Sequence, residues 1–184
     1  MADRTSIEEL KYKILPYVQY DGAWSIPDSF IKECWDKLVE NGLHEALFYS
    51  GVVIDREGFV QYLKLPMNKV FFIFIKKEIA AITWLNGVKQ NYALVHGTGF
   101  PVAWGKHTKP MMKEMLKAWF GIKKEDGEFL FDLLVGETPV NNPFALKFIE
   151  TIGMKRVGVV PLIAHDVYKK EKIGMAISYI KREV

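Results

Sequence analysis

The fold is decided by residues 142–160, whose sequence is NPFALKFIETIGMKRVGVV. Asn142 predicts a helix N-cap, because its side-chain oxygen can accept hydrogen bonds from the first free N–H groups, and Pro143 suits the first helical position. Apolar residues then recur at helical spacing, namely Phe144, Ala145, Phe148, Ile149 and Ile152. Gly153 predicts a left-handed helix end, after which Met154 and the following valines predict a strand.

Working outward, the pattern of apolar residues predicts the order helix, helix, three strands, helix, strand, helix and two strands. The further helices are expected over 28–41, after Asp55 and over 108–120, and the further strands over 70–75, 79–85, 91–98, 129–135 and 175–180. Asp28 and Thr108 are expected to be N-caps. Asn86 and Gly87 together indicate a hairpin or loop. Residues 6–15 suit either a helix or a strand.

Composition limits the class of protein before any motif is considered. The 184 residues are expected to form one domain, 1–184, with 1–27 as an N-terminal extension. Hydrophobic residues make up 49%, which is enough for a sizeable core. The net charge is only +3, with lysines scattered among acidic residues, so no nucleic-acid-binding face is indicated.

The single cysteine and the absence of long apolar runs exclude several further classes. Cys34 excludes an intrachain disulfide framework and a cysteine-based zinc site, and it is expected to be a buried thiol. No metal site is predicted. No apolar run reaches ~18 residues, so no transmembrane helix is expected. The first residues have no apolar signal core, so a cytoplasmic protein is the default expectation.

The decisive segment resembles the last helix and following strand of the GCN5-related N-acetyltransferases, whose pattern is Asn-x-x-Ala, an aromatic-rich helix and Gly-Phe. The pattern occurs here as Asn142, Ala145, Phe148, Gly153 and Met154. The order of elements is also similar to that family, best over 70–160. The resemblance implies an α/β (α+β) fold of the acyl-CoA N-acyltransferase type, with a mixed, mostly antiparallel, twisted sheet flanked by helices. The strands ending near Thr98 and Val135 are expected to form its central parallel pair.

The resemblance implies acetyl-CoA (coenzyme A) as the cofactor, bound after the third strand of the predicted meander. The family pattern is Pro, two residues, then Arg/Gln-Gly-x-Gly-x-Gly/Ala. Alignment on Pro101 puts Trp104 at the Arg/Gln position and Gly105 and Lys106 at matching ones. The expected cofactor-binding residues are Gly97, Thr98, Gly99, Phe100, Gly105, Lys106, His107, Thr108, Lys109 and Asn142.

His107 and Lys109 stand where the family prefers glycine. Glycines allow a backbone to approach phosphates closely, so side chains here are expected to crowd or redirect the cradle. However, Lys106, His107 and Lys109 are all donors or cations, and phosphate recognition could therefore shift from backbone amides to side chains.

Catalysis requires a base for the amine and a polarised thioester carbonyl. A backbone N–H in the strand end 97–100 is expected to polarise the carbonyl. His96 is the preferred base, because histidine titrates near neutrality, and Glu137, at the end of the next strand, is the second candidate. The usual acid of the family is a tyrosine four residues before the helix-ending glycine, and that position holds Ile149.

The resemblance thus implies transfer of an acetyl group from acetyl-CoA to an amine of an unknown acceptor, and a homodimer is left open. Two alternatives stand beside it. The first is a non-catalytic protein with the acetyltransferase fold that serves as a binding or assembly module, which the altered glycine loop and Ile149 favour. The second is an unrelated α/β scaffold without a cofactor.

Overall fold

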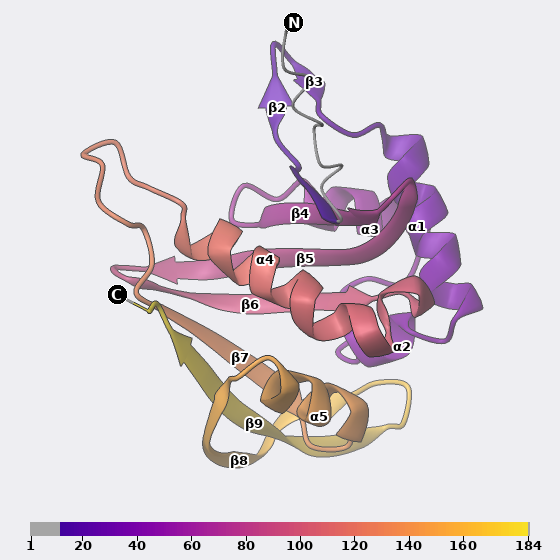
Figure 1. Cartoon of the computed structure of the whole chain (residues 1–184). Coiled ribbons are helices and arrows are strands. Elements are labelled where there is room, and N and C mark those ends of the chain that lie inside the picture. The colour runs from indigo at the N-terminus through magenta and orange to yellow at the C-terminus, as the bar shows by residue number, and fades with distance from the viewer. Residues whose placement is uncertain (1–11, 184) are drawn as a thin grey trace, which may run out of the picture.

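Seven strands form one sheet in the order β1-β4-β5-β6-β7-β9-β8, and helices lie on both of its faces (Figure 1). This computed structural model describes residues 12–183. The strands of the sheet are β1 (Tyr12–Pro16), β4 (Lys69–Ile75), β5 (Glu78–Lys89), β6 (Tyr92–Gly99), β7 (Leu133–Pro139), β8 (Lys155–Asp166) and β9 (Glu171–Lys181). A separate ribbon pairs β2 (Gln19–Tyr20) with β3 (Ala23–Trp24).

The α-helices are α1 (Asp28–Glu40), α2 (His44–Leu47), α3 (Arg56–Leu63), α4 (Thr108–Phe120) and α5 (Pro143–Thr151), and two short 3₁₀ helices, η1 (Pro101–Ala103) and η2 (Gly105–His107), precede α4. Strands β6 and β7 are parallel, and every other pairing in the sheet is antiparallel. The predicted mixed sheet with a central parallel pair is therefore confirmed. The two strands are joined through α4, as a parallel pair requires.

Two apolar cores lie on opposite faces of the sheet. On one face, α1 and α3 cover Phe72, Ile82 and Trp84 of the central strands. On the other face, α4 covers Ala81 and Leu134, and its stripe matches the expected helical spacing. The stripe of α4 is Met111, Met112, Met115 and Trp119. Because neighbouring residues of a strand point to opposite faces, the buried residues of the central strands are divided between the two cores.

Two predicted element boundaries on the central strands are wrong. The Asn86-Gly87 pair lies inside β5, which continues to Lys89. Gly87, with φ +55°, forms an irregularity in the pairing with β6 instead of a turn. The strand expected over 129–135 begins only at Leu133. Phe129 instead stands outside the sheet, with the guanidinium of Arg182 4.2 Å from its ring centre.

Of the predicted N-cap residues, Asn142 is confirmed, whereas Asp28 and Thr108 are wrong. Asn142 caps α5, since its side chain accepts from the Ala145 N–H at 3.0 Å. Asp28 makes no capping bond and instead pairs with Lys64 at 2.7 Å. Thr108 is already helical, and its hydroxyl donates to the Ala103 carbonyl at 3.0 Å.

The ambiguous N-terminal segment is a strand where the structure describes it. Tyr12–Pro16 pairs with β4 at one edge of the sheet, and residues 6–11 lie outside the described range. Cys34 is a buried thiol, 1% exposed, as expected, and burial raises its pKa to about 12. Among residues 12–183, none of the helices has the length and apolar character needed to cross a membrane.

Candidate active site

Strands β6 and β7 separate at the centre of the sheet. They pair only over Tyr92–Leu94 and Leu133–Val135. Beyond that point β6 still pairs with β5 as far as Gly99, and β7 still pairs with β9 as far as Pro139. The facing edges of residues 95–99 and 136–139 are therefore not joined to each other, and we call the gap between them the β6–β7 opening. Backbone groups on these edges remain available to a ligand that carries amides.

Two glycine amides of β6 point into this opening. The Phe100 N–H donates to the Ala80 carbonyl of β5 at 2.8 Å. Since successive residues of a strand direct their N–H groups to opposite sides, Gly97 and Gly99 direct theirs away from β5. Phe100 itself is 3% exposed and belongs to the core. Of the amides expected to polarise a thioester, those of Gly97 and Gly99 are therefore free to do so and that of Phe100 is not.

The N-terminal ends of α4 and α5 meet the same end of the opening. Because β6 and β7 are parallel, their carboxyl ends lie together, and α4 and α5 follow these two ends in the chain (Figure 1). A helix N-terminus presents unpaired N–H groups and the positive end of its dipole. At α5 the Asn142 side chain already accepts from the Ala145 N–H, so the loop before α4 is the part of this end most open to an anion such as a phosphate.

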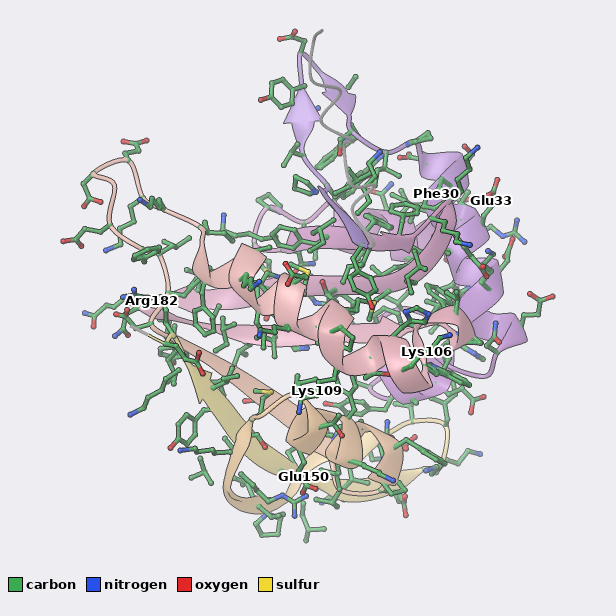
Figure 2. The ribbon with its side chains drawn as sticks, viewed as in Figure 1. Phe30, Glu33, Lys106, Lys109, Glu150 and Arg182 are labelled. Carbon is green, nitrogen blue, oxygen red and sulfur yellow. The ribbon has the colours of Figure 1, made fainter. Side chains whose placement is uncertain are left out.

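The loop before α4 carries the free positive charge of this region. The N–H groups of Gly105, Lys106 and His107 begin the 3₁₀ helix η2, so they have no acceptor within it. Lys106 and Lys109 are exposed at the start of α4 (Figure 2). Neither lysine has an ion-pair partner within residues 12–183. Gly105 has φ +65° and open space at its Cβ position, so its backbone can be approached closely.

His107 and Lys109, which stand where the family prefers glycine, do not crowd the loop before α4. His107 Nδ1 lies 3.2 Å from the Tyr12 hydroxyl, so its ring is directed toward β1. Lys109 lies on α4, with its side chain in solvent. Trp104, at the Arg/Gln position, is 54% exposed and its indole N–H donates to the Gly99 carbonyl at 2.9 Å. The indole therefore stabilises the end of β6 at the mouth of the opening.

Asn142 lies where β7 passes into α5, beside the β6–β7 opening. We expect Asn142→Ala to lower the free energy of unfolding by ~1 kcal/mol, because the first turn of α5 loses its cap. Urea unfolding measures this change. Asp55→Ala is the matched control, since Asp55 caps α3 in the same way, accepting from the Gly58 N–H at 2.7 Å. Equal stability of Asn142→Ala and the wild type would contradict the capping role.

On the face of the sheet that carries α1 and α3, the ring of His96 stacks on the apolar core. Its ring lies 5.5 Å from that of Trp84 at 14° between planes, and Trp84 in turn stacks on Phe48 at 6.1 Å. His96 Nε2 lies 2.9 Å from Asn86 Oδ1. Burial lowers the pKa of His96 from 6.5 to about 4, because the charged form is poorly solvated there. His96 is therefore a neutral imidazole at physiological pH.

This low pKa makes the folding stability depend on pH. His96 takes up a proton less readily in the folded chain than in the unfolded chain. The free energy of unfolding therefore falls as the pH decreases from 6.5 toward 4. We expect the wild type to lose ~2 kcal/mol more than His96→Gln between pH 7 and pH 5, measured by urea unfolding. The burial of a neutral His96 would be contradicted if the free energies of unfolding of the two proteins changed equally with pH.

Glu137 lies on the same face as His96, across the opening. Leu94 and Val135 are partners in the parallel pair, and side chains two residues apart share a face. The His96 and Glu137 side chains therefore both point to the face that carries α1 and α3. Glu137 is exposed. The two candidate bases thus flank the opening on one side, and the glycine amides lie between them and the loop before α4.

Tyr49 is a site residue that the sequence did not reveal. Burial raises its pKa, and the carboxylate of Glu137 and the nearby Tyr62 raise it further. Tyr49 lies in the turn after α2, where its carbonyl accepts from the Val167 N–H at 2.8 Å. No local pattern marks such a residue, because its neighbours Val167 and Glu137 are distant in the sequence. Ile149, at the family's acid position, is 8% exposed and is the buried residue of α5.

No family model and no curated protein matches the sequence, but solved structures match the fold. An acetyltransferase from Salmonella typhimurium that modifies the N-terminal serine of ribosomal protein L7/L12 has a TM-score of 0.72 at 10% identity, over 95% of this chain and 96% of that one. Spermidine N-acetyltransferase from Vibrio cholerae, solved with CoA and spermine, has a TM-score of 0.69 at 11% identity, over 93% and 95%.

A third similar structure is the microcin C7 self-immunity acetyltransferase, solved with acetyl-CoA and AMP. Its TM-score is 0.66 at 14% identity, over 85% of this chain and 89% of that one. All three similarities extend over most of both chains. The chain therefore has the fold of the GCN5-related N-acetyltransferases, although its identity to these three structures is only 10–14%.

Proposed function

We propose that the protein transfers the acetyl group of acetyl-CoA to a primary amine. The observation that carries this proposal is the β6–β7 opening, which has free glycine amides along one edge and two helix N-termini at one end. Acetyl-CoA combines an amide-bearing arm with a pyrophosphate, and these are the two chemistries that such an opening binds. Structures of the same fold hold acetyl-CoA or CoA, which supports the assignment.

In this proposal the pyrophosphate lies against the N–H groups of Gly105, Lys106 and His107, with Lys106 and Lys109 supplying charge. The ring of His107 is held by Tyr12, so it leaves room for the phosphates. The pantetheine arm then follows the free edges of β6 and β7 into the sheet. This course brings the thioester beside the amides of Gly97 and Gly99.

The chemistry then follows from the two faces of the sheet. The Gly97 and Gly99 amides polarise the thioester carbonyl, and the amine attacks it from the side of His96 and Glu137. Glu137 attracts the amine in its cationic form, which releases one proton to solvent and so becomes the neutral amine that attacks. His96 accepts the proton that the nitrogen loses once it has bonded to the carbonyl carbon, when that nitrogen is far more acidic than in the free amine. The carbon–sulfur bond breaks, and coenzyme A leaves as a thiolate.

Departure of the thiolate explains why Ile149 can stand in place of the family's tyrosine. Thiols have a pKa of about 8.5, so a thiolate is a good leaving group near neutral pH. Protonation by a dedicated acid therefore speeds the departure of a thiolate less than it would speed that of an alkoxide. Ile149 instead packs with the core, which stabilises α5 beside the opening.

Removal of the free lysines tests the cofactor site. We expect Lys106→Ala with Lys109→Ala to weaken acetyl-CoA binding at least tenfold, or about 1.4 kcal/mol, because each lysine makes a charge-assisted contact to phosphate. Titration calorimetry measures the affinity, and the difference should shrink at high salt. Lys155→Ala with Lys172→Ala removes the same charge from exposed positions on β8 and β9 and should leave the affinity unchanged. Equal losses in both double variants would contradict the site.

Turnover tests the reaction itself. The purified protein is incubated with acetyl-CoA and primary amines of different size, for example spermidine and a peptide with an N-terminal serine, and release of the free thiol of coenzyme A is followed. Amine-dependent release is expected with at least one class of amine. Saturable acetyl-CoA binding without any amine-dependent release would favour a binding module over an enzyme.

A further inference from the structure

His96 stands at the end of a chain of hydrogen bonds that begins at a backbone carbonyl. Asn68 Nδ2 donates to the carbonyl oxygen of Tyr62 at 2.7 Å. Asn86 Nδ2 donates to Asn68 Oδ1 at 3.4 Å, and Asn86 Oδ1 lies 2.9 Å from His96 Nε2. The chain therefore links the end of α3, the start of β4, β5 and β6. We call these three side chains the Asn–Asn–His relay.

The direction of the relay follows from its first member. A backbone carbonyl can only accept a hydrogen bond, so the end of the Asn68 amide that faces Tyr62 must be the nitrogen. Its oxygen then faces Asn86, which must present its own nitrogen to that oxygen. The oxygen of Asn86 is thereby turned to His96, and the ring nitrogen opposite it must carry a hydrogen.

We propose that Asn68 and Asn86 are positioning residues that hold His96 in the tautomer protonated at Nε2 and so leave the lone pair on Nδ1 for the proton of the amine. The part of this proposal that concerns catalysis rests on the acetyltransferase function above. The part that concerns the tautomer is a property of the free protein. A neutral imidazole has one donor and one acceptor nitrogen, so fixing the first assigns the second.

Solvent reaches the atom that the relay leaves unprotonated. The bond to Asn86 is the sole hydrogen bond of His96 within residues 12–183. Nδ1 is nevertheless absent from the buried polar atoms that lack a partner in that range, which include Nδ1 of His44. Nδ1 of His96 is therefore accessible, although most of the ring is buried. A donor group entering from the face of Glu137 can meet this lone pair directly.

Stacking prevents the ring from escaping the direction that the relay sets. The imidazole lies at 14° to the indole of Trp84, which is 2% exposed and cannot move aside. Turning the ring over would exchange Nδ1 with Cδ2 and Nε2 with Cε1, and so place a carbon opposite Asn86 Oδ1. That exchange would cost the hydrogen bond and leave a polar nitrogen without a partner in a largely buried site. The relay and the stack together select one orientation and one tautomer.

Nuclear magnetic resonance of the free protein tests the tautomer. The chain has 4 histidines, so histidine labelled with ¹⁵N gives few signals, and His96→Gln identifies those of His96. At pH 7, long-range ¹H–¹⁵N correlations should show Nε2 protonated and Nδ1 unprotonated. Protonation at Nδ1, or an even mixture of tautomers, would overturn the proposal.

Variants of the relay test which residues set the tautomer. Asn86→Asp keeps an oxygen acceptor, so the Nε2–H tautomer should persist. Asn86→Leu removes the acceptor, and Asn68→Ala frees the Asn86 amide to turn over, so both should populate the Nδ1–H tautomer. Asn41→Ala is the matched control, since it also removes an asparagine bond to a backbone carbonyl, that of Lys37 at 2.8 Å. An unchanged tautomer in folded Asn86→Leu and Asn68→Ala would overturn the role of the relay.

Kinetics then tests whether the tautomer matters for acetyl transfer. We expect Asn86→Leu to lower kcat at least tenfold with little change in KM for acetyl-CoA, and Asn86→Asp to recover most of that loss. If Asn86→Leu is too unstable to assay, Asn68→Ala serves the same purpose. A change of tautomer without loss of kcat would overturn the catalytic part. Absence of turnover in the wild type would instead contradict the proposed function, while the tautomer measurement in the free protein would still stand.

Discussion

His96→Gln is expected to lower kcat by about a hundredfold or more, which is the usual contribution of a positioned general base. A glutamine side chain can still donate to Asn86 Oδ1, the present partner of His96, but its amide is a far weaker base than the imidazole, even though burial lowers the pKa of His96 to about 4. The loss should therefore fall on kcat, and KM for acetyl-CoA should change little, because His96 lies on the amine side of the opening. Steady-state kinetics with a responsive amine provides the measurement.

His165→Gln is the control for this variant. His165 is exposed on β8, and β9 separates β8 from β7 at the opening. The same substitution there should leave kcat unchanged. The account of His96 fails if both variants retain wild-type kcat. It also fails if His96→Gln raises KM for acetyl-CoA as strongly as it lowers kcat, because the residue would then act on cofactor binding.

Gly97→Ala is expected to lower the free energy of unfolding by ~2–5 kcal/mol. A Cβ at this position would lie 2.7 Å from the Ile82 carbonyl oxygen and 2.9 Å from the Thr83 Cα. Both atoms belong to the backbone of the central strand β5, which cannot move aside as a flexible side chain would. The glycine also has φ +154°, which side chains disfavour. Overpacking and backbone strain each cost about 1–3 kcal/mol.

Gly158→Ala provides the comparison for Gly97→Ala. Gly158 is also in a strand, but nothing lies within 4 Å of its Cβ position and its φ is not positive. Urea unfolding of both variants separates the close contact from the general effect of replacing a strand glycine. The close approach of β5 and β6 is contradicted if Gly97→Ala is as stable as Gly158→Ala.

Features that depend on neighbours in the chain could be predicted from the sequence. The cap at Asn142 and the helix end at Gly153, with φ +89°, require only residues within one helix and its ends. The parallel pairing of β6 and β7 follows from a helix between two apolar strands. The resemblance to the acetyltransferases added the expectation that a backbone N–H in the strand end 97–100 meets the thioester.

Features that depend on tertiary contacts could not be predicted in this way. Asn86 and Gly87 carry the signal of a turn, yet pairing with β6 extends β5 through both residues. The turn signal concealed that Asn86 is a partner of His96. Tyr49 lies in an irregular turn, and its neighbours Val167 and Glu137 are distant in the sequence. Thr108 is a good capping residue by type, but the preceding 3₁₀ helix already continues into α4.

The loop at residues 104–109 illustrates the same limit at the candidate cofactor site. The replacement of glycine by His107 predicts a crowded cradle as long as its ring has no other place to lie. Tyr12, 95 residues earlier in the chain, provides that place at the adjoining strand β1. A departure from a sequence pattern thus changes its meaning once the side chain has a partner elsewhere in the fold.

A crystal structure of the protein soaked with acetyl-CoA tests the central claim most directly. The account predicts the pyrophosphate against the amides of Gly105, Lys106 and His107. It predicts the pantetheine arm between β6 and β7, and the acetyl carbonyl within hydrogen-bonding distance of the Gly97 or Gly99 N–H. The acetyl carbon should face His96. Acetyl-CoA bound elsewhere, or an opening that stays empty at millimolar acetyl-CoA, would contradict the account.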